Sequence, residues 1–312
     1  MNEPISFSDF CAYAEGYTPF RWELGDQSDF LPEDVRGKHS VLVSLVRFWL
    51  VANAVRKACP DFSTIVDVGA YPGAMIKILR HHFPQAFEYW AVGLGMTEEY
   101  RAEMQKLGGT CFETEIDPGF VAPAPAHAWP VRNADCVLLL DVIEHLVNPV
   151  DCLDVINKAL RDDGILVITT DNIASFANAY QMAKNGRSPN LQPLHSSLIY
   201  RGPWRPHFRE FSKDELAFYL DHAGFSVVEH RYFERRQGDY FFDANGKVGV
   251  HDRYRGLKGG LQRAILSVAP HLQDHQIVVA RKTIPHNEAI RRRPQPTSSM
   301  DEWLKILSAA NA

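Results

Sequence analysis

Apolar strand-like segments alternate with helical segments between residues 64 and 170, and this alternation restricts the fold more than any other feature of the sequence. The strand-like segments are TIVDVG (64–69), EYWAVGL (88–94), TCFETEI (110–116), DCVLLLDVI (135–143) and ILVITT (165–170). Helical patterns lie between them at 74–83, 97–108 and 149–164. This order predicts an α/β fold, in which a mostly parallel, doubly wound sheet has helices on both faces. Ligands of such sheets bind beyond the carboxyl ends of the strands, so the chemistry is expected just after residues 69, 94, 116, 141 and 170.

The remaining segments surround this core. Residues 1–60 are expected to be an N-terminal helical or lid segment, followed by the main domain at 61–283. Within that domain, 171–210 is too long for a plain connection and is predicted to be an inserted lid. A helix at 212–225 begins with a capping box of Ser212 and Glu215. Two late strands, 226–233 and 275–282, are separated by an excursion at 234–274, and a flexible tail is expected at 284–312.

Charge and composition exclude several classes of protein. The net charge of -5 gives no electrostatic indication of nucleic-acid binding, which usually requires a basic face. The longest apolar run, VLVSLVRFWLVANAV (41–55), contains Arg47 and Asn53, so it predicts a packed amphipathic helix rather than a membrane span. The five cysteines form no CxxC pair, and the chain begins without a signal-peptide pattern. A cytoplasmic protein is therefore expected.

The stretch IVDVGAYPGAMIKIL (65–79) predicts a strand, a glycine-containing turn and a helix. Such a turn exposes backbone N–H groups at a helix N-terminus, where anions bind. No Gly-Lys-Ser/Thr follows, which excludes a Walker loop, and Tyr71 and Ala74 occupy the second and third glycine positions of the dinucleotide fingerprint. The turn is expected to hold a smaller charged group than a pyrophosphate.

Later motifs are more specific. Residues 134–172, which include Asp141-Val-Ile-Glu-His-Leu146, and residues 207–229 (HFREFSKDELAFYLDHAGFSVVE) follow this turn. Together with Asp67–Gly73 they resemble the class I S-adenosylmethionine-dependent methyltransferases, in the subgroup with a D-V-I-E-H-L signature. The resemblance covers about residues 60–282 and implies a seven-stranded Rossmann-like methyltransferase sheet with S-adenosyl-L-methionine as cofactor.

The resemblance also implies a cofactor site. The residues that it places around the cofactor are Asp67, Gly69, Ala70, Tyr71, Gly73, Gly95, Asp117, Asp141 and Val142. The turn residues would surround the methionine moiety, Asp117 would contact the adenine amino group, and Asp141 with Val142 would flank the transferred methyl.

Two positions depart from the family pattern. Gly95 stands where the family usually has an acid that holds both ribose hydroxyls, so Glu98 reaches back, or backbone and water hold the ribose, or the affinity for the cofactor is weak. Tyr71 stands in the glycine turn, where its side chain could pack on the cofactor or point toward the substrate.

His145 and His207 are the candidate catalytic residues. His145 could accept a proton, shape the loop around the cofactor or bind a metal, and His207 lies in the lid, where it could touch the substrate or brace the lid with Arg209. Neither candidate histidine stands in an HxxxH or HxH cluster, so no metal is expected. The lid combines arginines with Tyr200 and Trp204, which favours an anionic or sugar-like acceptor.

The leading hypothesis is an O-methyltransferase acting on a small-molecule or saccharide-linked acceptor, with no nucleic-acid partner. Methyl transfer requires mainly positioning and removal of a proton, which agrees with a sequence that has no catalytic triad. Two alternatives stay open: a methyltransferase-like partner subunit without catalysis, and a nicotinamide-dependent oxidoreductase.

Overall fold

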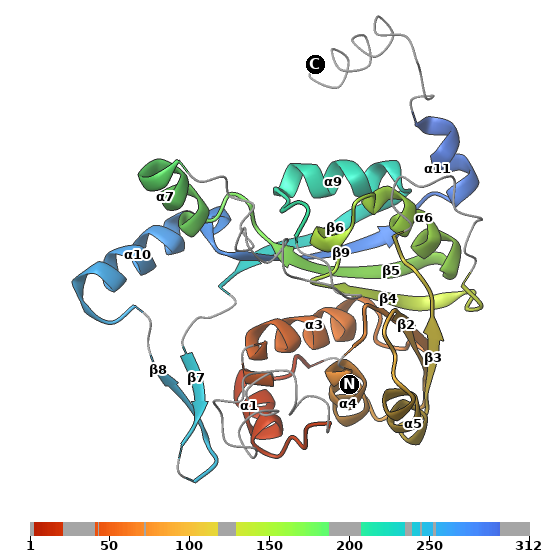
Figure 1. Cartoon of the computed structure of the whole chain (residues 1–312), viewed down its shortest axis with the longest axis horizontal. Coiled ribbons are helices and arrows are strands. Elements are labelled where there is room, and N and C mark those ends of the chain that lie inside the picture. The colour runs from red at the N-terminus through yellow and green to blue at the C-terminus, as the bar shows by residue number, and fades with distance from the viewer. Residues whose placement is uncertain are drawn as a thin grey trace, which may run out of the picture.

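The computed structural model describes residues 3–20, 41–42, 44–71, 73–117, 129–186, 207–234, 239–243, 245–251 and 254–293. Seven strands form one sheet in the order β3-β2-β1-β4-β5-β9-β6 (Figure 1). They are β1 (Thr64–Val68), β2 (Glu88–Gly93), β3 (Gly109–Glu113), β4 (Ala134–Leu140), β5 (Leu160–Asp171), β6 (Phe225–Phe233) and β9 (His275–Lys282). The first five are parallel, whereas β9 runs antiparallel between β5 and β6. The mostly parallel seven-stranded sheet expected from the sequence is thereby confirmed.

Helices cover both faces of the sheet, because alternate strand residues point to opposite sides. One face packs against α3 (Leu45–Ala58), α4 (Ala74–His82) and α5 (Glu98–Lys106), with Ile65, Leu138 and Val167 among the strand residues turned toward them. The other packs against α6 (Pro149–Ala159) and α9 (Lys213–His222), toward which Val66 and Leu139 point. Continuous burial of the central strands explains their uninterrupted apolar sequences.

The N-terminal segment belongs to this core. Helix α1 (Phe7–Glu15) and helix α3 join the apolar cluster of the sheet face that α4 covers. Asn53 and Trp49 of α3 hold the chain at Ile5 through hydrogen bonds. The helix predicted at 41–55 is therefore a packed helix. None of the helices within the described ranges has the length and hydrophobicity that crossing a bilayer requires.

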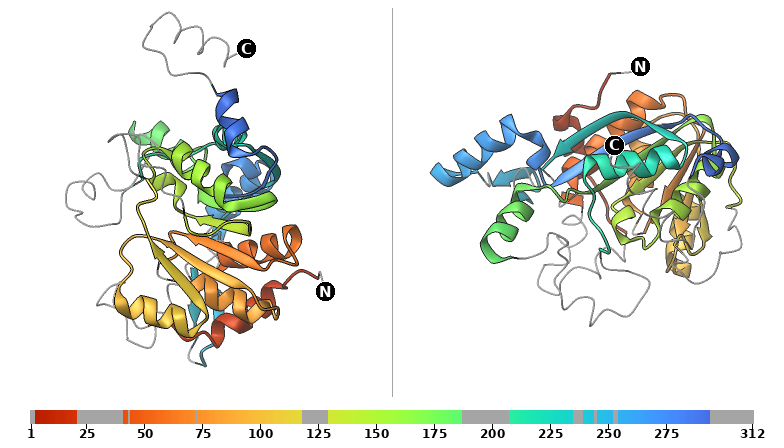
Figure 2. Two further views of the ribbon diagram at one scale, coloured as in Figure 1. Left: turned by 90° about the vertical axis from the view of Figure 1, so that its right-hand side faces the viewer. Right: turned by 90° about the horizontal axis from the view of Figure 1, so that it is seen from above.

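The excursion between β6 and β9 adds a further helix and a hairpin that packs against α1. It contains the hairpin of β7 (Asp239–Phe242) and β8 (Val248–His251), then α10 (Gly256–Val268) and the short η3 (Pro270–Leu272). Glu15 of α1 pairs with Lys247 at the hairpin and accepts a hydrogen bond from the Val248 amide. Helix α10 extends beyond the end of the sheet (Figure 2).

Several boundaries differ from those expected. Helix α6 ends at Ala159 rather than 164, because Leu160 pairs beside Ala134 of β4 and begins the longer strand β5. Strand β4 ends at Leu140, and the single-turn helix η2 (Ile143–His145) follows it. The segment expected to begin the flexible tail forms α11 (His286–Arg292), fixed by an ion pair of Arg293 with Asp154. The tail from 294 onward lies outside the described residues.

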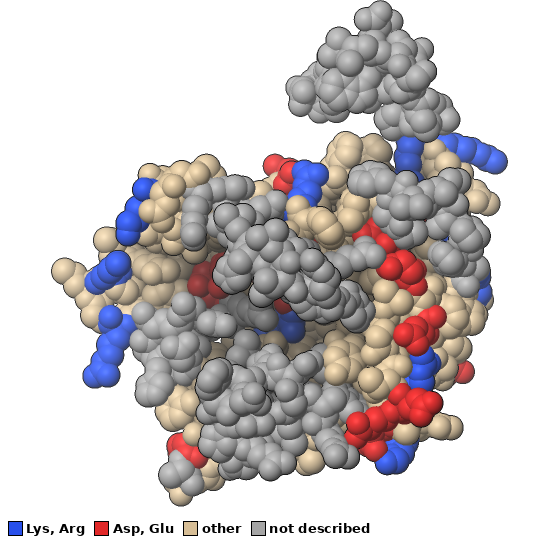
Figure 3. All heavy atoms as spheres, viewed as in Figure 1, with Lys and Arg blue, Asp and Glu red and all other residues tan. Residues whose placement is uncertain are grey.

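Lys and Arg side chains project near α7 (Phe176–Asn185) and α10, whereas acidic and basic side chains lie next to one another near α5 (Figure 3). There Arg101 pairs with Glu113, and Lys106 pairs with Glu103.

Gly224 at the end of α9 provides a test of this packing. Its φ is +86°, and an added Cβ would lie 2.5 Å from the Ile284 carbonyl oxygen and 2.8 Å from Asn157 Nδ2. Gly186 at the end of α7 has φ +61° but nothing within 4 Å, so it is a matched control. We expect Gly186→Ala to lower the free energy of unfolding by about 1 kcal/mol and Gly224→Ala by at least about 3 kcal/mol, measured by urea unfolding. Equal losses would contradict the packing of the α9 end against 284.

The buried carboxyl of Asp67 in β1 provides a second test. Burial raises its pKa from 3.8 to about 7, although the Tyr89 hydroxyl donates a hydrogen bond to it and Arg47 is nearby. Between these two pH values the unfolded chain has released the proton and the folded chain keeps it, so stability falls as the pH rises. We expect the free energy of unfolding of the native protein to fall by up to about 4 kcal/mol across this pH range. The Asp67→Asn variant should lack this fall, as measured by urea unfolding at several pH values. Parallel curves for the variant and the native protein would show that Asp67 ionises normally in the fold.

Candidate functional site

The residues singled out from the sequence come together at the carboxyl ends of the parallel strands, which form one edge of the sheet. The carboxyl ends of β1, β2, β4 and β5 lie there, and because β9 is antiparallel, its first residue, His275, lies at the same edge (Figure 1). This is the edge at which ligands of parallel α/β sheets bind.

The glycine turn after β1 is closely packed from below. Gly69 has φ +72°, its amide donates to the Val92 carbonyl at 2.7 Å, and an added Cβ would lie 2.5 Å from Val142 Cγ2. Gly73, at φ +96°, is the N-cap residue of α4, and no side chain caps the start of that helix. Gly69 is exposed at this edge, whereas Gly73 is buried, and a Cβ on Gly73 would lie 3.1 Å from the Tyr100 ring. Both positions of the turn therefore require glycine, for backbone conformation and for packing.

Tyr71 contacts the protein as well as lining the turn. Its half-buried ring packs against Tyr100 of α5, with 5.5 Å between the ring centroids. The neighbouring Ala70 is buried, and Pro72 lies outside the described residues. The tyrosine is accommodated beside the turn, and contact with the cofactor stays a prediction.

Asp141 is held by side chains from two other elements of the fold. It directly follows β4 in the left-handed region (φ 51°), which aspartate tolerates better than most residues. One carboxylate oxygen pairs with Arg47 of α3, and the other accepts a hydrogen bond from Thr169 Oγ1 at 2.7 Å. Val142, next in sequence, packs on Gly69. Asp141, Val142 and the glycine turn thus form one contact unit.

Asp117 and Gly95 have defined partners of their own. Asp117 is fully buried and accepts hydrogen bonds from the backbone amides of Val147 and Asn148, which precede α6. Its contact with adenine stays a prediction. The Gly95 amide donates to Glu113 Oε1 at 3.1 Å, and Arg101 pairs with the other oxygen of that carboxylate. An acid from the end of β3 therefore stands beside the position where the family acid of strand two is missing.

Histidines and carboxylates alternate along the rest of the edge. His207 Nδ1 lies 3.3 Å from Asp171, and the other oxygen of Asp171 lies 3.0 Å from His275 Nε2. The rings of His145 and His207 meet edge to face with centroids 4.6 Å apart.

Burial raises the pKa of the Glu144 carboxyl, and the charge of Asp171 raises it further. Burial alone would lower the pKa of His275, but Asp171 and Asp274 raise it overall.

Only part of the predicted lid is described. Helix α7 opens it, and Arg209 at its end pairs with Glu215 and donates to the Tyr219 hydroxyl at 3.0 Å, so Arg209 braces this end of the lid against α9. Tyr200 and Trp204, which suggested an acceptor site, lie outside the described residues.

Four residues of the edge were missed in the sequence: Arg47, Glu113, Asp171 and His275. Arg47 did carry a signal, since a single arginine interrupts an otherwise apolar helix. His275 could not be found, because only the antiparallel direction of β9 brings the start of that strand to this edge.

Several solved structures match this chain at low sequence identity. A methyltransferase of Mesorhizobium loti dependent on S-adenosylmethionine is 16% identical, with 75% of this chain and 96% of that chain covered and a TM-score of 0.46. The 1,6-didemethyltoxoflavin-N1-methyltransferase of Burkholderia thailandensis is 17% identical, with 86% and 95% covered and a TM-score of 0.43. A complex that contains the Trm112 methyltransferase activator of Haloferax volcanii matches at 12% identity, with 88% and 98% covered and a TM-score of 0.47. No curated protein matches the sequence.

A family model described as a methyltransferase domain matches residues 45–230, which include the glycine turn, Asp141 and both candidate histidines. The match begins at the first residue of α3, so it also includes Arg47. The seven-stranded sheet with one antiparallel strand agrees with this match. The chain therefore belongs to the methyltransferase domain family and is a methyltransferase that uses S-adenosyl-L-methionine.

Proposed function

We propose that this methyltransferase methylates a hydroxyl oxygen of a small-molecule or saccharide-linked acceptor. The observation that carries the proposal is the position of His145 and His207: their rings are in contact, and His145 follows Asp141 closely in sequence at the cofactor edge. A hydroxyl is a weak nucleophile until its proton is removed, so an oxygen acceptor requires such groups beside the reacting atom. We propose these two histidines as the catalytic residues.

The cofactor contacts are proposed in the same way. Gly69, Ala70, Tyr71 and Gly73 would receive the methionine moiety through their backbone, with Asp67 beneath them, Asp141 and Val142 beside the methyl group, and Asp117 near the adenine. When bound, S-adenosyl-L-methionine supplies an electrophilic methyl group. The work of the protein is to exclude water, orient the acceptor oxygen and take up its proton.

The direct test combines binding with product analysis. We expect S-adenosylhomocysteine to bind the full chain in calorimetry, and methyl groups to appear on oxygen when hydroxylated and amine acceptors of similar shape are compared by mass spectrometry. Gly69→Ala should weaken this binding at least about 10-fold, because its Cβ would displace Val142, whereas Gly186→Ala should bind like the native protein. Methylation of amines alone would refute the oxygen acceptor, and binding without any methylated product would favour a partner subunit without catalysis.

Glu113 is proposed to take the place of the missing ribose acid. Its carboxylate already accepts a hydrogen bond from Gly95, and a carboxylate there could accept hydrogen bonds from ribose hydroxyls. We expect Glu113→Gln to weaken S-adenosylhomocysteine binding about 10-fold, since a charge-assisted hydrogen bond is lost. Glu98→Gln, at an exposed position of α5, is the control and should change the affinity less than about 2-fold. The reverse order of effects would assign the ribose to Glu98.

A further inference from the structure

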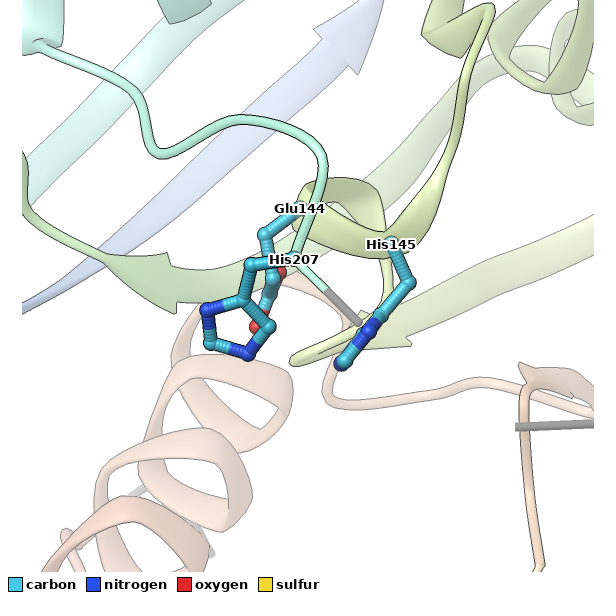
Figure 4. A group of neighbouring side chains, drawn as sticks. All are labelled: Glu144, His145 and His207. Atoms are coloured by element: carbon cyan, nitrogen blue, oxygen red, sulfur yellow. The ribbon is translucent and has the colours of Figure 1, made fainter. Parts of the chain in front are cut away.

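Three side chains that can bind metal converge beside Asp141. Glu144 and His145 belong to η2, and His207 comes from the segment before α9. One possible ligand atom from each lies within 4.8 Å of the other two, and the three side chains point toward a common space (Figure 4). We propose that Glu144, His145 and His207 bind a divalent first-row transition-metal ion. The inference rests on the proposed function, since the ion would hold the hydroxyl oxygen of the acceptor.

The backbone fixes the two halves of this cluster together. The Glu144 carbonyl oxygen accepts hydrogen bonds from the amides of Phe208 at 2.8 Å and Arg209 at 3.3 Å. His207 therefore starts from a segment anchored on η2 itself, although it is distant from η2 in sequence. Within the cluster, Thr170 donates to Glu144 Oε2 at 2.8 Å and orients the carboxylate, which is 1% exposed.

The surroundings of His207 match those of a metal-bound histidine. Its Nδ1 lies 3.3 Å from Asp171 and 4.0 Å from Glu210, so Nε2 is the nitrogen directed to the ion. Histidine ligands commonly give their second N–H to a carboxylate, which orients the ring and makes it a better ligand. The other oxygen of Asp171 lies 3.0 Å from Nε2 of His275. Asp171 thus acts as a positioning residue.

The donor set selects the class of ion. Two imidazoles and one carboxylate suit zinc, cobalt or iron, whereas magnesium prefers oxygen ligands alone. Two ligands at about 2.1 Å from one ion are at most about 4.2 Å apart, so small side-chain rotations would complete the site. Three protein ligands leave a position for the acceptor oxygen. With the ion bound, His145 and His207 would be its ligands in place of proton acceptors. A hydroxyl bound to the ion would have a lowered pKa and release its proton to solvent.

The test uses the full chain freed of metal by chelation. We expect one equivalent of Zn²⁺ in calorimetry, visible absorption bands when Co²⁺ is added, and Mg²⁺ binding at least about 100-fold weaker than Zn²⁺. His145→Ala and His207→Ala should abolish the cobalt bands, and Asp171→Asn should weaken Zn²⁺ about 10- to 100-fold while keeping the bands. His81→Ala removes an exposed histidine of α4 and should change nothing.

The outcomes separate the ion site from the proposed function. The metal site is refuted if the native protein gives no cobalt bands, or if the bands persist in both His145→Ala and His207→Ala. Neither result depends on how the variants fold. S-Adenosylhomocysteine binding to the metal-free protein, measured in parallel, tests the cofactor edge alone. Metal binding that depends on the two histidines, without S-adenosylhomocysteine binding, would support the ion site and refute the proposed function.

Discussion

The ion pair between Arg47 and Asp141 joins helix α3 to the edge of the sheet where the candidate site lies. Both side chains are largely buried, at 11% and 15% exposed, and Thr169 engages the second oxygen of Asp141. Removing one partner of a buried pair typically costs about 3–5 kcal/mol, because the other charge stays without compensation. The pair thus fixes α3 at the point where β4 ends and η2 begins. The N-terminal segment is consequently part of the site and not an appendage to the sheet.

From Asp141, alternating acids and histidines continue the edge toward the acceptor side. His275 Nε2 is 3.8 Å from Asp141 and 3.0 Å from Asp171, which in turn faces His207. Each carboxylate in this row faces a histidine, which in its protonated form supplies the opposite charge that a buried carboxylate requires. The glycine turn, with Gly69 exposed and the Tyr71 ring half-buried, forms the other side of the edge. In the proposed function, the turn would receive the charged amino-acid group of the cofactor, and the histidines would face a polar acceptor.

Much of the sheet could be predicted from the sequence, because buried parallel strands leave long apolar runs and their connecting helices show a clear period. The capping box at Ser212 and Glu215 was also readable, and its hydrogen bonds are present. The end of α6 was misjudged, since Gly164 looked like a helix stop, whereas pairing of Leu160 with Ala134 begins the strand earlier. The partners of the site were harder to predict. Arg47 and Glu113 reach it through tertiary packing, which no local spacing records.

The antiparallel direction of β9 has a consequence for how the acceptor side can change. Residues 234–274 leave the sheet at the end of β6 and return at His275, so both ends of this excursion open at the reactive edge. The entropic cost of closing a loop grows only slowly with its length. Insertions can therefore accumulate here without shifting the register of β6 against β9. A longer connection would therefore reshape the proposed acceptor side, while the glycine turn after β1 stays unchanged.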